Sequence, residues 1–185
     1  MDNGASSYRR YLSGDDNGIL EIVTAYKDGL ILYLNGYVKN ILLAEELAEE
    51  TFFRLMVRKP LFFARCSFKT WLYAIGRNLA TDQLRRNSRR ADIPLEEFEN
   101  ILAEEADLER DYLRQERKIQ LHNCMKKLNP DYRQALHLAY FEGFSNGEIC
   151  FILRKSERQI RNLLYRARQA LKTELEKEGF IYEEL

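Results

Sequence analysis

Apolar residues recur every three to four positions along most of this chain, which is the spacing of amphipathic α-helices. Pro60 interrupts the pattern, and a short apolar stretch follows it before Ser67, a suitable helix cap, opens the next periodic segment. Gly29 and Gly36 fall inside one segment and argue against an unbroken helix there. The N-terminal half is predicted to contain helices over residues 8–13, 19–39, 43–59 and 67–90.

A second periodic cluster begins near residue 119. Asn129 and Pro130 form a cap followed by proline at the first helical position, and Gly143 closes that helix. Two helical clusters in one chain of 185 residues predict an all-α fold with two small helical domains.

Residues 145–171 contain two helix starts only 11 residues apart. Ser145 with Glu148, and Ser156 with Gln159, have the S-x-x-E and S-x-x-Q spacing of capping boxes. The result is a helix of about two turns, a tight turn and a longer helix, which is the helix-turn-helix arrangement.

The longer helix of this motif has one apolar and one basic face. Its inner face comprises Ile160, Leu163, Leu164, Ala167 and Leu171, and its outer face comprises Arg158, Arg161, Tyr165 and Arg168. Such a helix can enter a DNA major groove, where its N-terminal side chains meet base edges. The alternative is an ordinary helical hairpin whose arginines are only solvated.

The net charge is zero, but the charges are unevenly distributed. Residues 1–94 carry a net charge of +3, residues 95–118 carry −5, and residues 119–185 carry +2. Two mildly basic segments therefore flank an acidic connector, and this asymmetry is compatible with nucleic-acid binding. The connector is predicted to be a flexible linker that is partly helical near residues 104–117.

The composition indicates a soluble protein with folded cores, since 45% of the residues are hydrophobic and 31% are charged. No apolar run approaches the roughly 18 residues that a membrane span needs. The N-terminus also lacks the apolar core of a signal peptide. A cytoplasmic protein without membrane insertion is predicted.

The three cysteines, Cys66, Cys124 and Cys150, are widely spaced and odd in number. They form no C-x-x-C pair, and only His122 and His137 could join them as ligands. The sequence therefore argues against a disulfide framework or a zinc site, and predicts no metal. Small, mostly buried cysteines are the favoured interpretation.

The predicted helix over residues 67–90 carries basic side chains beside aromatic ones. This combination suits a platform for single-stranded nucleic acid. An ordinary core helix with a soluble outer face explains the same pattern equally well.

Taken together, these segments resemble the extracytoplasmic-function (ECF) group of bacterial sigma factors. AEELAEETFFRL (44–55) and FKTWLYAIGRNLATDQLRR (68–86) resemble the family's second conserved region. LNPDYRQALHLAYFEGFSNGEICFIL (128–153) and SERQIRNLLYRARQAL (156–171) resemble its fourth region. The resemblance implies a region 2 helical bundle over residues 1–90, a linker over 91–118 and a region 4 helix-turn-helix over 119–185.

The resemblance implies two roles for the first domain. Its acidic helix would dock on the clamp coiled coil of the largest subunit of core RNA polymerase, with Glu45, Glu46 and Glu49 as contacts. The loop over 61–67 and the following helix would melt the −10 promoter element and hold a flipped base. The candidate −10 contacts are Phe62, Lys69, Arg77, Asn78, Arg85 and Arg86.

The second domain would read the −35 element as duplex DNA and contact the polymerase flap. The candidate −35 contacts are Ser156, Glu157, Arg158, Arg161, Tyr165 and Arg166. Arginine with guanine and glutamate with cytosine are the chemically matched pairings. The sequence departs from the family at Arg154 and Lys155, because the turn there commonly contains glycine.

The function that follows is promoter-specific transcription initiation, with no enzymatic activity and no cofactor, and with an anti-sigma factor as a further partner. One alternative is a stand-alone helix-turn-helix regulator, which leaves the acidic helix unexplained. Another is an all-α nucleotide pyrophosphohydrolase that binds magnesium through the E-E-x-x-E-E pattern over 45–50. Such an enzyme needs a second acidic helix, and no Asp or Glu occurs between Thr51 and Thr81.

Overall fold

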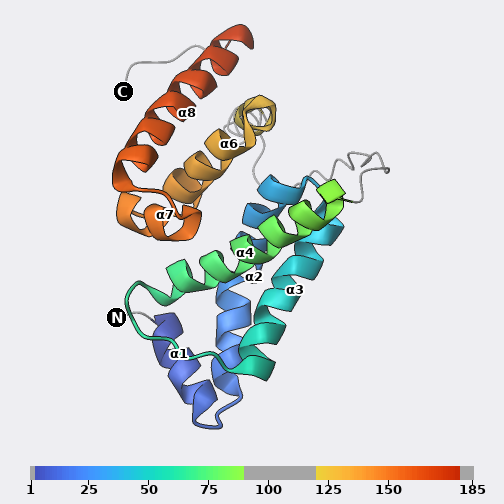
Figure 1. Cartoon of the computed structure of the whole chain (residues 1–185), viewed down its shortest axis with the longest axis vertical. Coiled ribbons are helices and arrows are strands. Elements are labelled where there is room, and N and C mark those ends of the chain that lie inside the picture. Colours follow the sequence, from blue (N-terminus) through green and yellow to red (C-terminus); the bar gives the residue numbers. More distant parts are fainter. Residues whose placement is uncertain (1–2, 90–119, 180–185) are drawn as a thin grey trace, which may run out of the picture.

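The computed structural model describes residues 3–89 and 120–179. The N-terminal half contains four helices, drawn blue to green in Figure 1. They are α1 (Asn3–Leu12), α2 (Asn17–Val38), α3 (Ile41–Arg58) and α4 (Phe68–Arg89). Helix α4 lies across the top of this group, next to the C-terminal half (Figure 1). The all-α prediction is confirmed, and the described residues contain no strand.

The C-terminal half, drawn yellow to red in Figure 1, is also helical. Residues 120–127 are helical and precede the other elements. These are α6 (Pro130–Leu136), the π-helical turn η1 (His137–Phe141), α7 (Asn146–Leu153) and α8 (Glu157–Lys177). The π-helical turn was not predicted, because the sequence pattern resembles one continuous α-helix up to Gly143.

The two halves share one hydrophobic core. Its buried residues include Leu34 and Leu72 from the N-terminal half and Leu138 and Ile149 from the C-terminal half. A second, smaller cluster packs α6 and α8 against residues 120–128. The direct packing of α4 on α7 and of α2 on α6 was not anticipated from the sequence. The predicted linker over residues 91–118 lies outside the described residues.

One smaller prediction is corrected by the structure. Gly29 and Gly36 do not break α2, which is one helix of 22 residues. The cysteines are mostly buried, as predicted, since Cys124 is fully buried and Cys66 and Cys150 are only partly exposed. Over the ranges that the structure covers, no helix combines the length and apolar character needed to cross a membrane.

The turn between α7 and α8 is formed without glycine. Arg154 adopts the left-handed conformation (φ 53°) and ends α7 by donating its backbone N–H to the carbonyl oxygen of Cys150. A side chain makes this conformation costly, by about 1 kcal/mol relative to glycine. The helix-turn-helix geometry is therefore retained at some cost in stability.

We expect Arg154→Gly to raise the free energy of unfolding by about 0.5–1 kcal/mol, because glycine adopts this conformation without strain. The reverse change, Gly143→Ala, should lower stability, since Gly143 also has a positive φ of 70°. Urea unfolding followed by circular dichroism would measure both. A destabilised Arg154→Gly protein would contradict this account of the turn.

Candidate functional site

The helix-turn-helix is built as the capping boxes predict. The Ser145 side chain accepts a hydrogen bond from the backbone N–H of Glu148, and Ser156 accepts one from Gln159. In return, the Glu148 and Gln159 side chains accept from the backbone N–H groups of their serines. Both helix starts are therefore satisfied locally.

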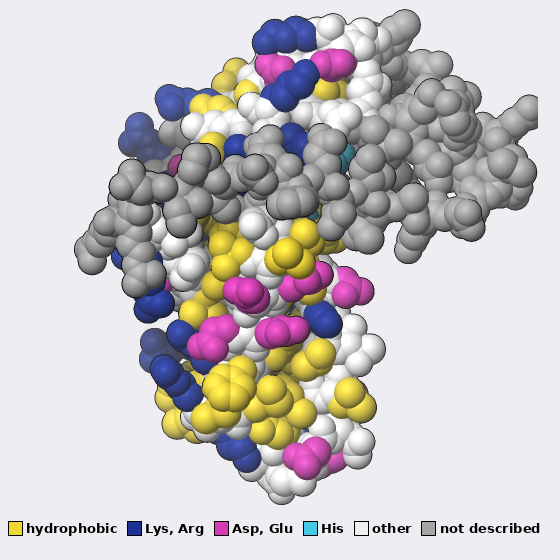
Figure 2. Space-filling model, turned by 90° about the vertical axis from the view of Figure 1, so that its right-hand side faces the viewer, with side chains coloured by type: hydrophobic (Ala, Val, Ile, Leu, Met, Phe, Trp, Pro, Cys, Tyr) yellow, Lys and Arg dark blue, Asp and Glu magenta, His cyan; other side chains and the backbone are white. Residues whose placement is uncertain are grey.

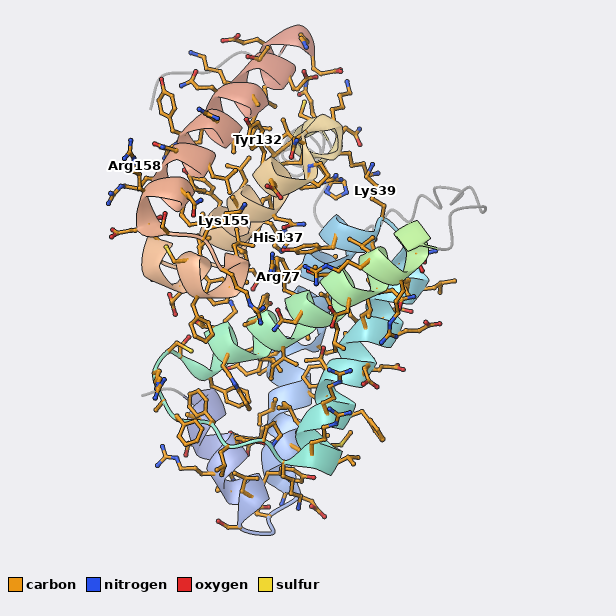
Figure 3. All side chains as sticks on the ribbon, viewed as in Figure 1. Lys39, Arg77, Tyr132, His137, Lys155 and Arg158 are labelled. Atoms are coloured by element: carbon orange, nitrogen blue, oxygen red, sulfur yellow. The ribbon has the colours of Figure 1, made fainter. Side chains whose placement is uncertain are left out.

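The candidate −35 residues lie on the exposed face of α8 and at its cap. Ile160, Leu164 and Ala167 on the opposite face are buried, as predicted. Arg158 points away from the rest of the molecule in Figure 3. Arg161 donates to Glu157 at 3.0 Å, so these two side chains are held beside each other. The exposed set is Ser156, Glu157, Arg158, Arg161, Tyr165 and Arg166.

The candidate −10 residues on α4 are less uniformly exposed than the candidate −35 residues on α8. Arg77 and Asn78 are half-buried, whereas Arg85 and Arg86 are exposed. Arg77 donates from Nε to the hydroxyl of Tyr37 at 3.2 Å. A cavity of about 330 Å³ separates this part of α4 from the α7–α8 turn. Its lining comprises Arg77, Asn78, Thr81, Asp82, Arg85, Leu153, Arg154 and Lys155.

The loop before α4 contains two adjacent phenylalanines, of which one is packed against the protein and the other is exposed. Phe62 packs inward, with its ring 5.2 Å from Trp71 and 5.6 Å from Phe68, measured between centroids. Phe63 is 74% exposed. The sequence led us to name Phe62 as a DNA contact, but Phe63 is the ring that is accessible. Only side-chain burial distinguishes the two, and a short irregular loop gives no periodicity from which to predict it.

The face of α3 combines acidic and apolar side chains. Glu45, Glu46 and Glu49 are exposed on it. Figure 2, viewed from the α3 side, shows acidic side chains above a gathering of hydrophobic ones. The exposed hydrophobic residues at the end of α3 and in the loop after it are Phe53, Met56, Val57, Leu61 and Phe63. The sequence analysis missed this apolar patch, although the aromatic and aliphatic residues after Thr51 were visible.

The two halves are joined by a nearly buried carboxylate. Glu142, which directly follows the π-helical turn, lies 2.8 Å from Lys69 Nζ, and its side chain is 11% exposed. Tyr73 donates its hydroxyl to the same carboxylate oxygen at 2.8 Å, and Lys69 also donates to the Glu142 backbone carbonyl at 2.9 Å. His137 Nε2 lies 3.4 Å from the other carboxylate oxygen. Lys69 is therefore engaged by the C-terminal half.

Glu148 makes a second connection between the two halves. One carboxylate oxygen of Glu148 accepts from Ser145 in the capping box of α7. Its other oxygen accepts from the hydroxyls of Ser67 at 2.9 Å and Thr70 at 2.8 Å. These two residues lie at the N-terminus of α4, where a negative charge is favourable. Glu148 thus caps its own helix and binds the start of another.

The pKa of Glu142 is shifted by this environment. Burial raises the pKa, but hydrogen bonding to His137, Lys69 and Tyr73 outweighs burial and lowers the pKa from 4.5 to about 2. A carboxylate with a depressed pKa stabilises the folded state above pH 4.5 and loses that contribution as the pH falls toward 2. The ionised form of Glu142 is the one that holds the two halves together.

We expect Glu142→Gln to reduce the loss of stability on acidification. Between pH 6 and pH 2.5 the wild-type protein should lose about 2.5 kcal/mol from this group, and the variant should lack this contribution. Urea unfolding at a series of pH values would measure the difference. Glu176→Gln, at an exposed site on α8, is the control and should retain the wild-type profile. Parallel profiles for wild type and Glu142→Gln would contradict the assignment.

No group of three or more metal-ligating side chains that could hold an ion occurs within residues 3–89 and 120–179. The features assembled above are instead two basic surfaces, one acidic and apolar surface, and a charged contact between the halves.

Two family models match the chain in this order. The model of sigma-70 region 2 matches residues 22–90, which include α3 and α4. The model of sigma-70 region 4 matches residues 118–171, which include the helix-turn-helix.

Curated relatives and solved structures agree with these matches. The chain is 30% identical to the ECF RNA polymerase sigma factor SigM of Bacillus subtilis over 156 residues, covering 82% of this chain and 91% of SigM. It is 28% identical to SigW of the same organism, covering 88% of this chain and 91% of SigW.

Among solved structures, the sigma factor RpoE of Bartonella quintana, in complex with the anti-sigma factor NepR, has the same fold. The TM-score is 0.69 at 21% identity, covering 84% of this chain and 95% of RpoE. With both conserved regions matched in order and relatives matched along most of their length, this chain belongs to the ECF sigma factors, which are DNA-binding factors of transcription initiation.

Proposed function

We propose that residues 1–90 bind core RNA polymerase and the −10 element, that residues 91–118 link the domains, and that residues 119–185 read the −35 element. The observation that carries this division is that the two basic surfaces lie on different halves, one on α4 and one on α8. One contiguous surface would suit a stand-alone regulator. Two surfaces on different halves suit a protein that reads two separated promoter elements.

The α8 surface has the chemistry of duplex reading. Arg158 and Glu157 lie in its first turn and are exposed, so they can reach base edges in the major groove. Ser156 and Arg161 extend the same surface, and Tyr165 and Arg166 lie further along the helix, where phosphate contacts are expected. The ion pair of Glu157 with Arg161 orients both side chains before DNA binds.

The α4 surface suits the melted −10 strand. Lys69, Arg77, Asn78, Arg85 and Arg86 supply charge and hydrogen-bond donors for the backbone, and aromatic side chains supply stacking surfaces. The exposed ring of Phe63 is better suited to this stacking than the packed ring of Phe62. We therefore add Phe63 to the residues that contact the flipped base.

The α3 surface suits a protein partner. Its glutamates would steer the domain toward a basic surface of the polymerase, and the exposed apolar patch beside them would provide the buried area that holds it there. In this assignment Glu45, Glu46 and Glu49 bind the clamp coiled coil of the largest subunit, while the C-terminal half contacts the flap.

The remaining features follow from this role. The protein acts in the cytoplasm, where the polymerase is, and has no enzymatic activity and no cofactor. The sigma factor RpoE was solved in complex with the anti-sigma factor NepR, and a second structure of similar fold, CnrH, in complex with the cytosolic domain of CnrY. By analogy, we include an anti-sigma factor among the partners of this protein.

Run-off transcription with bacterial core polymerase over a library of promoter sequences tests the proposal. Start sites that appear only with this protein and share two separated elements would support it. Binding to duplex DNA without any core-dependent transcript would reject it and favour a stand-alone regulator.

The double variant Glu45→Lys/Glu46→Lys should abolish core-dependent transcripts, because it reverses the charge of the polymerase surface. Binding of the free protein to a −35 duplex should remain within about twofold of wild type, since α3 lies on the other half. Co-purification with core polymerase and a gel-shift assay would measure the two effects. Equal losses in both assays would indicate misfolding rather than a polymerase contact.

Arg158→Ala and Arg166→Ala are a second pair of test variants. In the proposal, Arg158 contacts base edges and Arg166 contacts phosphates. Arg158→Ala should relax the preference at one −35 position, with a loss of about 1–3 kcal/mol on the preferred base. Arg166→Ala should weaken binding evenly across sequences and reduce its salt dependence. Binding to a set of single-base −35 variants at two salt concentrations would separate these outcomes. An even loss for Arg158→Ala would contradict its role in base reading.

A further inference from the structure

Helix α1 precedes residues 22–90, which match the region 2 model, and two of its tyrosines contact the segment that joins α3 to α4. Tyr8 is fully buried and donates its hydroxyl to the backbone carbonyl of Pro60 at 2.8 Å. Tyr11 donates to the backbone carbonyl of Met56 at 3.1 Å. In Figure 1 the chain runs past α1 on its way from α3 to α4. Helix α1 therefore holds both the end of α3 and the start of the loop.

Two residues of this segment have a backbone conformation that side chains rarely adopt. Lys59, the C-cap of α3, has a φ of 41°, and Ala64 has a φ of 52°. Neither residue is glycine, so each is destabilised by close contacts of its Cβ atom. Such a conformation persists only where the surrounding structure enforces it. The Lys59 ammonium lies 4.9 Å from the centroid of the Tyr11 ring, so α1 supplies one of the contacts that hold this strained residue.

Tyr8 also belongs to the aromatic cluster against which the loop packs. Its ring centroid lies 5.4 Å from that of Phe68 and 5.6 Å from that of Trp71. The Phe62 ring packs on the same two side chains, whereas the neighbouring Phe63 is exposed. Because Phe62 and Phe63 are adjacent in the chain, whatever fixes Phe62 also limits where the Phe63 ring can lie.

We propose that α1 positions the loop that captures the flipped −10 base, with Tyr8 as the main positioning residue. The inference rests on the proposed function, because it assumes that Phe63 contacts that base. Tyr8 is fully buried, so it acts through the loop and not on DNA directly. Its hydroxyl holds the Pro60 carbonyl and its ring supports Phe62, which are the two sides from which the start of the loop is fixed.

Helix α1 is in turn fixed on α2. The Ser7 hydroxyl donates to the Glu21 carboxylate at 2.6 Å. The two backbones approach closely at Gly18, where a Cβ atom would lie 2.2 Å from the Ser7 carbonyl oxygen and 2.8 Å from the Tyr11 backbone nitrogen. Only glycine permits this approach. Position 18 therefore offers a way to displace α1 without changing the loop or any candidate DNA contact.

We expect Tyr8→Phe, which removes only the hydroxyl, to weaken binding of the single-stranded −10 element about fivefold, as for the loss of one hydrogen bond. The protein is tested in complex with core polymerase, and the probe is the non-template −10 strand of a promoter selected by the run-off experiment. Binding to the −35 duplex and to core polymerase should not change. Tyr140→Phe is the matched control and should bind the −10 strand as wild type does, because the Tyr140 hydroxyl accepts from Arg168 in the C-terminal half.

A double-mutant cycle distinguishes positioning of the loop from a general effect on stability. If Tyr8 acts by placing Phe63, then Tyr8→Phe should change −10 binding by less than about twofold in a protein that already carries Phe63→Ala. A purely structural role for Tyr8 would weaken binding by the same factor in both backgrounds. Circular dichroism would establish that each variant is folded.

Gly18→Ala tests the same proposal from α2. It should displace α1 and weaken −10 strand binding at least as much as Tyr8→Phe does. Gly36→Ala on the same helix is its control, because a Cβ atom at position 36 would meet nothing within 4 Å. Glycine-to-alanine changes ordinarily strengthen a helix. The two variants therefore differ mainly in whether they displace α1.

The outcomes separate the two proposals. Wild-type binding of the −10 strand by Tyr8→Phe and Gly18→Ala would overturn the role of α1 but leave the sigma function intact. Equal losses on the −10 strand, the −35 duplex and core polymerase, or an undiminished effect of Tyr8→Phe beside Phe63→Ala, would do the same. A wild-type complex that captures no −10 strand would reject the proposed function and this inference with it.

Discussion

A carboxylate that leaves water must find partners that replace its hydration, because an uncompensated buried charge costs several kcal/mol. Glu142 finds those partners on the other half of the chain, in the ammonium of Lys69 and the hydroxyl of Tyr73. Its burial therefore depends on the two halves being together. Glu148 extends the same dependence to the start of α4. The position of α4 relative to the C-terminal half follows in part from where these two side chains are satisfied.

Local features of the structure could be predicted from the sequence because their causes are local. The capping boxes at Ser145 and Ser156 require residues only three positions apart, and both formed as expected. The buried face of α8 follows from helical periodicity, which any window of that helix displays. The turn at Arg154 formed despite the absence of glycine, because the caps and packing on either side outweigh the cost of one left-handed residue.

The contact between the halves could not be predicted in the same way. Lys69 and Glu142 are 73 residues apart in the chain, and no periodicity relates them. Both residues also have a plausible local explanation, Lys69 as a basic residue of a DNA-binding helix and Glu142 as part of a helix end. Gly29 illustrates the same limit. The sequence suggests that it weakens α2, whereas the structure shows that it leaves room for Tyr73 and Glu142.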